Sequence, residues 1–213
     1  MDEVLNRYRQ LLAEVDAWFA RSHSILASSS DCRGCAECCR GLFDITLLDA
    51  ALLRQGFEHL PEATRADVLT RVRPIIDRLQ KRLTGFAHPY LLDGMPVEEL
   101  PLPGEEETPC PLLDAAGRCL LYAQRPLTCR LYGLPHIDRS GEVFLDEWCS
   151  HSLGGNRDPL AIEGLRWEFR RLFAEEGLLL QALASRLNLP ADKDFDTFIP
   201  AALLIDFDRL RRR

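Results

Sequence analysis

The chain has 213 residues, of which 46% are hydrophobic and 28% charged, a composition typical of a globular protein with one sizeable core. Its formal net charge of −7 argues against a general binder of nucleic acid or anionic membranes, because such proteins need a basic surface. No apolar run approaches the roughly 18 residues of a membrane helix, and acids from residue 2 onward argue against a signal peptide. We therefore expect a cytoplasmic protein with no membrane and no nucleic-acid partner.

The first predicted element is an amphipathic helix over residues 2–27. Apolar residues recur there at steps of three and four, which places them on one face of a helix. Serines at positions 28–30 end the pattern and lead into a cysteine-rich stretch. The residues of the expected apolar face are Leu5, Tyr8, Leu12, Val15 and Phe19.

A second helix is predicted just after the first cysteines. Thr46, followed three residues later by Asp49, resembles a capping box that opens a helix. The helix should run to about Gln55, because Gly56 is a natural residue to follow a helix C-terminus.

Residues 61–84 predict a further helical segment that Gly85 ends. Pro74 lies inside it and should kink the segment or divide it into two helices, since proline cannot donate the internal hydrogen bond. From residue 89 to 111 the frequent prolines and the acidic run at 105–107 predict a loop.

The middle of the chain predicts short elements. The stretch "CPLLDAAGRCLLY" indicates a turn over residues 114–117 followed by a short strand. Arg125-Pro126 should start a helical turn through Cys129, because proline suits the first helical position. "HIDRSGEVFLDEW" is typical of a hairpin with Ser140-Gly141 at its tip.

Two helices are predicted to close the chain. Asp158-Pro159 should form the N-cap and first position of a long helix to about Leu187, and a last helix should span Phe198 to Arg211. The expected inner face of the long helix contains Ile162, Leu165, Phe169, Leu172 and Phe173.

These elements predict a mainly α fold with a small, irregular α+β cysteine-rich metal-binding core and helical extensions at both ends. We expect one domain over residues 1–213. Its parts are a core at 32–150, a helical insertion at 40–109, and flanking helices at 2–27 and 158–211.

The eight cysteines carry the functional signal. Stable disulfides are uncommon in the cytoplasm, and adjacent cysteines such as Cys38-Cys39 would form a strained bridge. Two thiols separated by two residues can instead bind one metal from a tight turn, and "CRGCAECC" has this spacing twice. We therefore predict metal ligation, in one shared site or two sites of four. The candidate ligands are Cys32, Cys35, Cys38, Cys39, Cys110, Cys119, Cys129 and Cys149.

The spacing favours an iron–sulfur cluster of the [4Fe–4S] type, with zinc as the alternative. Structural zinc sites are usually built from two separate C-x-x-C knuckles, whereas this chain has one overlapping triple step, which is typical of iron–sulfur loops. His136 and His151 are weaker candidate ligands, because a lone histidine is more often an ordinary surface or core residue.

A thiolate-bound metal carries negative charge that needs nearby donors and cations. Four thiolates around zinc(II) leave a net charge of about −2. Arg125 and Arg130, beside Pro126 and Cys129, are the arginines that we expect to neutralise and hydrogen-bond the centre.

The cysteine pattern resembles the CxxCxxCC cysteine-cluster family, described as a zinc- or iron-chelating domain, over roughly residues 32–150. The same domain occurs in proteins similar to flagellin lysine N-methylases, for which the resemblance implies an iron–sulfur centre. The chain departs from the family pattern by its long insertion at 40–109. The matching residues beyond the first cluster are Cys110-Pro111, Gly117, Cys119, Tyr122, Arg125-Pro126, Cys129-Arg130 and Tyr132.

Three functions follow as hypotheses. The first is a metal-binding protein with a structural or redox centre. The second, implied by the resemblance, is a cluster-dependent protein-lysine N-methyltransferase-like enzyme. The third is a zinc-stabilised adaptor that binds a protein partner through its helical flanks. The sequence has no P-loop, nucleophile elbow or radical C-x-x-x-C-x-x-C loop, so it predicts metal binding without indicating a reaction.

Overall fold

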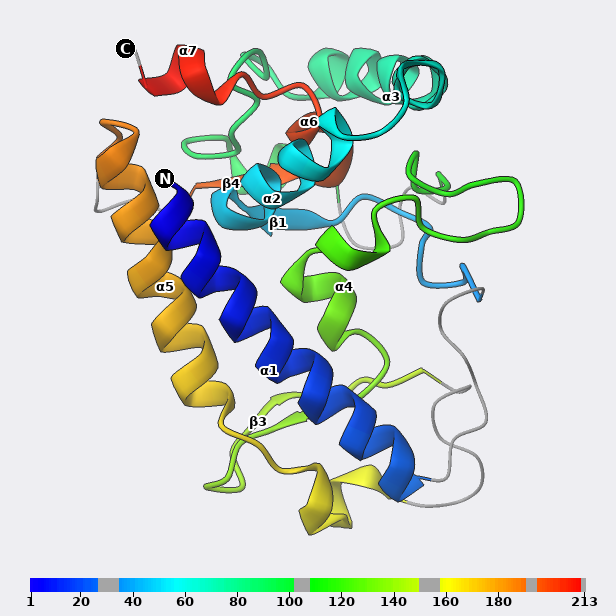
Figure 1. Cartoon of the computed structure of the whole chain (residues 1–213), viewed down its shortest axis with the longest axis vertical. Helices are drawn as coiled ribbons and strands as arrows, with labels where there is room; N and C mark the ends of the chain where they lie inside the picture. The colour runs from blue at the N-terminus through cyan, green and yellow to red at the C-terminus, as the bar shows by residue number, and fades with distance from the viewer. Residues whose placement is uncertain (27–34, 102–107, 150–157, 191–194, 212–213) are drawn as a thin grey trace. The chain divides into compact units, whose positions relative to one another are not determined.

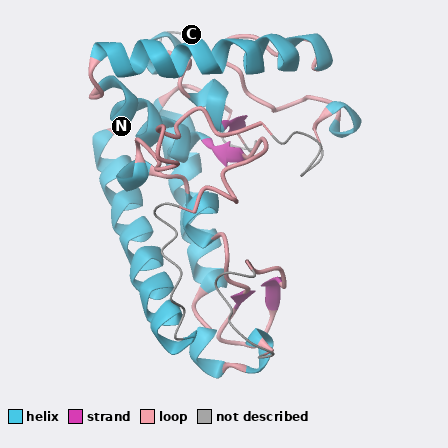
Figure 2. Cartoon of the chain, turned by 90° about the vertical axis from the view of Figure 1, so that its right-hand side faces the viewer, coloured by secondary structure: helices cyan, strands magenta, loops and turns pink. Residues whose placement is uncertain are grey.

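The computed structural model describes residues 1–26, 35–101, 108–149, 158–190 and 195–211. This part of the chain is mainly helical, with two small antiparallel sheets of two strands each, which confirms the predicted fold class (Figure 2). No helix within these ranges is both long and apolar enough to cross a bilayer. The contacts divide the chain into two compact units, and the single domain over residues 1–213 stays a prediction. One unit contains Met1, Cys32–Pro126 and Leu180–Arg213, and the other contains Asp2–Asp31 and Leu127–Leu179.

In the second unit, the predicted N-terminal helix is confirmed as α1 (Asp2–Leu26). Its apolar face is buried as expected, except that Trp18 takes the place foreseen for Phe19, which is half-buried. Helix α1 runs antiparallel to α5 (Phe169–Arg186) (Figure 1). The Tyr8 hydroxyl, near the start of α1, donates to Glu176 of α5 at 3.2 Å.

Trp18 lies at the centre of an aromatic core in this unit. Its ring stacks on Trp167 at 5.8 Å between centroids and meets the edge of Phe169 at 5.0 Å. Its indole Nε1 donates to the backbone oxygen of Leu165 at 3.1 Å, so the buried polar atom is satisfied. The ring of His136 stacks on the ring of Phe169, at 5.1 Å between centroids.

The prediction of a long helix that starts at Asp158-Pro159 is wrong for its first ten residues, which precede the observed α-helix. Asp158 does act as an N-cap, accepting from the Leu160 N–H at 3.0 Å, but it caps only a 3-10 turn, Pro159–Ala161. The α-helix α5 begins at Phe169. The reason is that the Trp167 N–H donates to Ile137 at 2.9 Å along the neighbouring hairpin, and this pairing requires an extended backbone.

That hairpin confirms the prediction for residues 136–148. Strands β2 (His136–Ile137) and β3 (Val143–Leu145) pair antiparallel, and Gly141 at the tip has a φ of 89°, which suits glycine. Asp138, just after β2, takes the capping role for α5 that the sequence assigned to Asp158. Its Oδ1 accepts from the Arg170 N–H at 3.0 Å, and its Oδ2 accepts from the N–H and hydroxyl of Ser140.

We expect Asp138→Ala to lower the free energy of unfolding by about 1–2 kcal/mol, the effect typical of a lost helix N-cap. Hydrogen bonds from the Arg170 and Ser140 amides lower the pKa of Asp138. A carboxylate whose pKa is lowered by folding stabilises the protein above its unfolded pKa of about 4, and this contribution is lost as the pH falls through the folded pKa. Urea unfolding at about pH 7 and about pH 3 measures both effects.

The matched control is Asp146→Ala, because Asp146 is an exposed acid just after the same hairpin. It should leave the unfolding free energy within about 0.5 kcal/mol of the wild-type value. The prediction would be contradicted if Asp138→Ala lowered the free energy of unfolding by the same amount at both pH values. The charged carboxylate would then not be the source of the stability.

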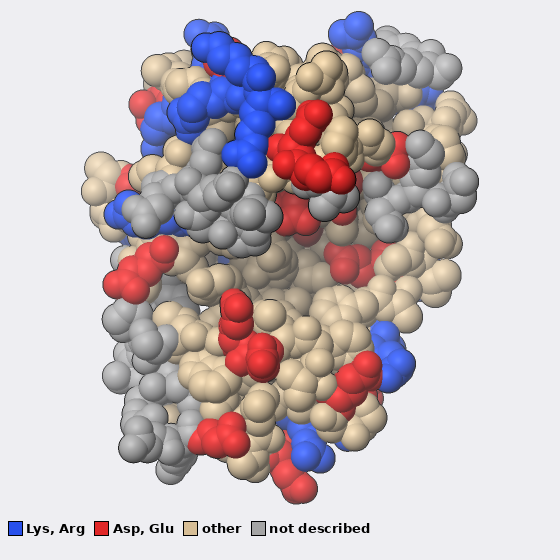
Figure 3. All heavy atoms as spheres, turned by 180° about the vertical axis from the view of Figure 1, so that it is seen from behind, with Lys and Arg blue, Asp and Glu red and all other residues tan. Residues whose placement is uncertain are grey.

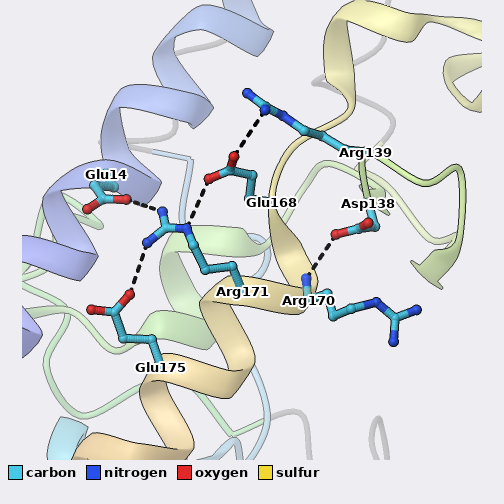
Figure 4. A network of polar contacts seen from close by, with 7 residues as sticks. All are labelled: Glu14, Asp138, Arg139, Glu168, Arg170, Arg171 and Glu175. Carbon is cyan, nitrogen blue, oxygen red and sulfur yellow. Dashed lines mark hydrogen bonds and ion pairs between the residues drawn. The ribbon is translucent and has the colours of Figure 1, made fainter.

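Charged side chains on the surface of this unit join α1 to α5 (Figure 4). The Arg171 guanidinium pairs with Glu168 and Glu175 at 2.9 Å each and also with Glu14 of α1. Exposed pairs contribute about 0–1 kcal/mol each, so the network adds to the aromatic core without replacing it.

In the first unit, helix α2 (Leu47–Glu58) begins as predicted, with Thr46 as N-cap accepting from the Asp49 N–H at 3.5 Å. Its predicted end at Gln55 is wrong, because the helix continues for three residues. Gly56 does not end the helix. A Cβ there would lie 2.9 Å from Cγ of Gln124, so the glycine allows the close approach of that side chain.

Helix α3 (Glu62–Arg82) confirms the predicted helical segment at 61–84. It continues through Pro74, so the alternative of two separate helices is wrong. Gly85 follows with a φ of 86°, a conformation that favours glycine after a helix.

The last predicted helix, Phe198 to Arg211, is wrong. Its first residue belongs to strand β4 (Asp196–Phe198), which pairs antiparallel with β1 (Asp44–Thr46). Two short helices follow, α6 (Ile199–Ala202) and α7 (Phe207–Arg211). The pairing joins residues about 150 positions apart, and no local sequence pattern predicts such a contact.

Candidate metal centre

The CxxCxxCC loop is described from Cys35 onward, in the first unit. Ala36 has a φ of 53°, in the left-handed region that side chains seldom adopt. The Cys39 N–H donates to the Ala36 oxygen at 3.1 Å and closes a turn. The loop therefore folds back on itself between Cys35 and Cys39.

Backbone hydrogen bonds place this loop beside the first distal cysteine. The Cys110 N–H donates to the oxygen of Cys39 at 2.8 Å, and the Gly41 N–H donates to the oxygen of Thr108 at 3.0 Å. Residues Arg40 and Pro109 between them form an antiparallel bridge. Two cysteine segments about 70 residues apart in sequence thus lie side by side.

Cys119 is brought to the same region by a turn at Asp114, which confirms the predicted turn. Asp114 Oδ1 accepts from the N–H groups of Ala116 and Arg118 at 2.9 and 2.8 Å. The short strand expected after it is wrong, because only a single bridge joins Leu113 to Cys119 before a 3-10 turn, Tyr122–Gln124. The bridge is enough to bring Cys119 back toward Cys110.

The thiols of Cys38 and Cys119 both act electrostatically on the thiol of Cys110. A hydrogen bond with Cys39, together with burial, raises the pKa of Cys38 well above its usual range. Burial raises the pKa of Cys110 to about 11, with smaller contributions in the same direction from Cys119 and Cys38. Burial also raises the pKa of Cys119. Because metals bind thiolates, binding here must displace protons from the thiols.

Two arginines oppose these shifts. Arg125, predicted from the sequence, lies over the ring of Tyr122 at 4.1 Å and lowers the pKa of both Cys38 and Cys119. Arg71, which sequence reasoning missed, lowers the pKa of Cys110. It belongs to α3, in the insertion at 40–109, and no spacing rule connects that helix with a cysteine.

Helix α3 is the source of several cations in this unit. Figure 3 shows Lys and Arg side chains gathered where α3 runs, at the upper left of the face drawn. Among the basic residues of α3, Arg71 is half-buried, whereas those from position 73 onward are exposed. The basic residues of α3 are Arg65, Arg71, Arg73, Arg78, Lys81 and Arg82.

Cys129 and Cys149 lie in the second unit. Cys129 is on α4 (Leu127–Leu131), which confirms the helical turn predicted after Arg125-Pro126. The Cys149 N–H donates to the oxygen of Gly133, just beyond that helix, at 3.2 Å. The structure therefore brings the backbone of Cys149 close to the end of the helix that carries Cys129.

Arg130 and His136 have partners in the second unit other than thiols. The buried guanidinium of Arg130 forms an ion pair with Asp16 of α1. His136 is buried against Phe169 with its Nε2 3.2 Å from the oxygen of Leu131, and burial lowers its pKa. Its side chain is thus accounted for by packing.

The seven cysteines in the described ranges are all free thiols, each half-buried. Cys32 and His151 lie outside the described residues. Within the described part, no three Cys, His, Asp or Glu side chains are arranged to hold a metal ion. The donor set nevertheless suits a thiophilic metal, because Cys38 and Cys119 both act on the pKa of Cys110, and Arg71 and Arg125 lower the pKa values of these thiols.

Comparison with known proteins identifies one family. The model of the family CxxCxxCC, described as "Putative zinc- or iron-chelating domain", matches residues 31–150, more than half of the chain. No curated protein and no solved structure matches the chain. The matched range contains all eight cysteines and the whole insertion at 40–109.

Proposed function

The chain belongs to the CxxCxxCC family of zinc- or iron-chelating domains, and from this premise we propose that its cysteines bind an iron–sulfur cluster, of the [4Fe–4S] type, in preference to zinc. One observation carries the proposal. The backbone hydrogen bond from Cys110 to Cys39 holds the overlapping C-x-x-C loop beside the segment that carries the first distal cysteine.

The proposed ligands fall into two sets according to the unit that contains them. Among the described residues, Cys35, Cys38, Cys39, Cys110 and Cys119 belong to the first unit, and Cys129 and Cys149 to the second. Three thiols at successive C-x-x-C steps on one loop can each hold a different iron of one cluster. Zinc would need only four of the thiols in a tetrahedral arrangement.

The proposed role of the centre is to stabilise the fold and to exchange electrons. The segments around Cys35–Gly41 and Thr108–Leu121 have no α-helix or ladder of more than one bridge in the described residues. Segments of this kind gain their stability from metal binding where hydrophobic burial is small. A bound cluster would supply redox chemistry, at a potential set by burial and by hydrogen bonds to its sulfurs.

Elemental analysis of the full chain after anaerobic purification tests the proposal. We expect a brown protein with about four irons and four sulfides per cluster and a visible absorption band that bleaches on reduction. If the protein contained zinc but neither iron nor sulfide, the result would support the zinc site and contradict the iron–sulfur cluster. Neither metal in fresh anaerobic protein, with the thiols joined as disulfides, would refute metal binding altogether.

A further inference from the structure

We propose that Arg71 of helix α3 donates its Nε–H to a sulfur of the metal centre at Cys110, so that the insertion at 40–109 forms part of that centre. The proposal rests on the proposed function, because it requires a metal at Cys110. It adds a role for a residue outside the cysteine segments and outside the arginines that the sequence indicated.

The Arg71 guanidinium is held at two of its three nitrogens. Nη2 donates to Asp67, one turn earlier on α3, at 2.8 Å. Nη1 donates to the backbone oxygen of Leu113, and the Leu113 N–H in turn donates to the oxygen of Cys110 at 3.1 Å. These contacts anchor the guanidinium to the turn that begins at Cys110.

The third nitrogen has no acceptor. Nε of Arg71 is buried and makes no hydrogen bond to any described residue. A buried donor of a charged group without an acceptor is costly, and native proteins seldom leave one unsatisfied. A metal-bound thiolate or a cluster sulfide at Cys110 is an acceptor of the required kind, whereas the neutral thiol of the metal-free protein is a weak one.

The electrostatics agree with this placement. Burial raises the pKa of Cys110 to about 11. Arg71 acts in the opposite direction, so the guanidinium charge stabilises the thiolate form of Cys110. The opposing carboxylate of Asp67 is 70% exposed and therefore screened by water. The exposed Asp67 thus offsets little of the guanidinium charge, which remains to act on Cys110.

A purely structural alternative is that Arg71 only clamps the Leu113 turn. Both readings predict that removing the side chain destabilises the loop, so unfolding measurements alone do not separate them. They differ at Nε. A sulfur-bound Nε–H should become protected from exchange with solvent when metal is added, and a clamp would leave it unchanged.

The experiment uses the full chain loaded with zinc, whose binding does not need assembly of a cluster. Zinc affinity is measured by competition with a chromogenic chelator for wild type, Arg71→Met, Arg71→Lys and Arg73→Met. We expect Arg71→Met to weaken zinc binding about 10–100-fold, as loss of an outer hydrogen-bond partner typically does. Arg71→Lys keeps the charge and lacks Nε, so its zinc affinity should lie between those of Arg71→Met and wild type. Arg73→Met removes an exposed charge from the same helix and should bind as wild type does.

A second measurement needs no folded variant. The arginine Nε–H signals of wild type are followed by NMR, and the Arg71 signal, identified from its neighbours, should shift and exchange more slowly when zinc is added. Equal zinc affinity in Arg71→Met and Arg73→Met, or an Arg71 signal unaffected by zinc, would overturn the inference. Failure of wild type itself to bind zinc or iron would instead overturn the proposed function, so the two failures are distinguishable.

Discussion

Cys110→Ser is expected to weaken metal binding by more than about 100-fold, beyond the 10–100-fold typical of an outer partner, because it removes a ligand itself. Cys110 is the distal thiol that the backbone ties most directly to the CxxCxxCC loop, through its hydrogen bond to Cys39. Serine keeps the size and the backbone hydrogen bonds but offers a hydroxyl that does not ionise near neutral pH and suits thiophilic metals poorly. Metal content after anaerobic purification, followed by affinity for added zinc, measures the effect.

Thr108→Ser is the control for this prediction. Thr108 lies two residues earlier in the same segment, and its hydroxyl accepts from Arg78 at 3.0 Å, a contact that serine can keep. We expect wild-type metal content in this variant. If Cys110→Ser also retained its full metal content, Cys110 would not be a ligand, and the centre would have to be built from other thiols.

Trp18→Ala is expected to lower the free energy of unfolding by about 3–5 kcal/mol, the range for removal of a buried aromatic side chain. Trp18 is 1% exposed and contacts the rings of Trp167 and Phe169. Alanine leaves a cavity between α1 and the start of α5 and also leaves the Leu165 oxygen without its indole donor. A loss of this size is a large share of the roughly 5–15 kcal/mol that stabilises a typical domain.

Urea unfolding followed by far-ultraviolet circular dichroism measures the change, because the variant loses one of three tryptophans and fluorescence would not be comparable. Phe19→Ala is the matched control, since Phe19 is the next residue on α1 and only half-buried. Phe19→Ala should lower the free energy of unfolding clearly less than Trp18→Ala does. The reverse order would mean that the apolar face predicted through Phe19, rather than the observed core at Trp18, stabilises the unit.

Features encoded in short stretches of sequence were predicted correctly. The periodicity of residues 2–27, the capping pair Thr46 and Asp49, the turn at Asp114 and the hairpin around Ser140-Gly141 each depend on neighbours within a few positions. The same is true of the C-x-x-C spacing that identified the family. Local backbone geometry decides all of these, so the residues alone were sufficient.

Only the tertiary structure revealed the contacts between residues that are distant in the sequence. The β1–β4 pairing displaced the helix expected at Phe198, and the contact of Trp167 with Ile137 delayed the start of α5 to Phe169. The backbone hydrogen bond between Cys110 and Cys39 and the contact of Arg71 with Leu113 also join residues far apart in the sequence. Such contacts form because burial and hydrogen bonding across the fold outweigh local preference. The amino-acid sequence by itself thus predicted the cysteines as candidate metal ligands, and the folded chain decided that the backbone of Cys110 lies beside Cys39 and that Arg71 contacts the turn after Cys110.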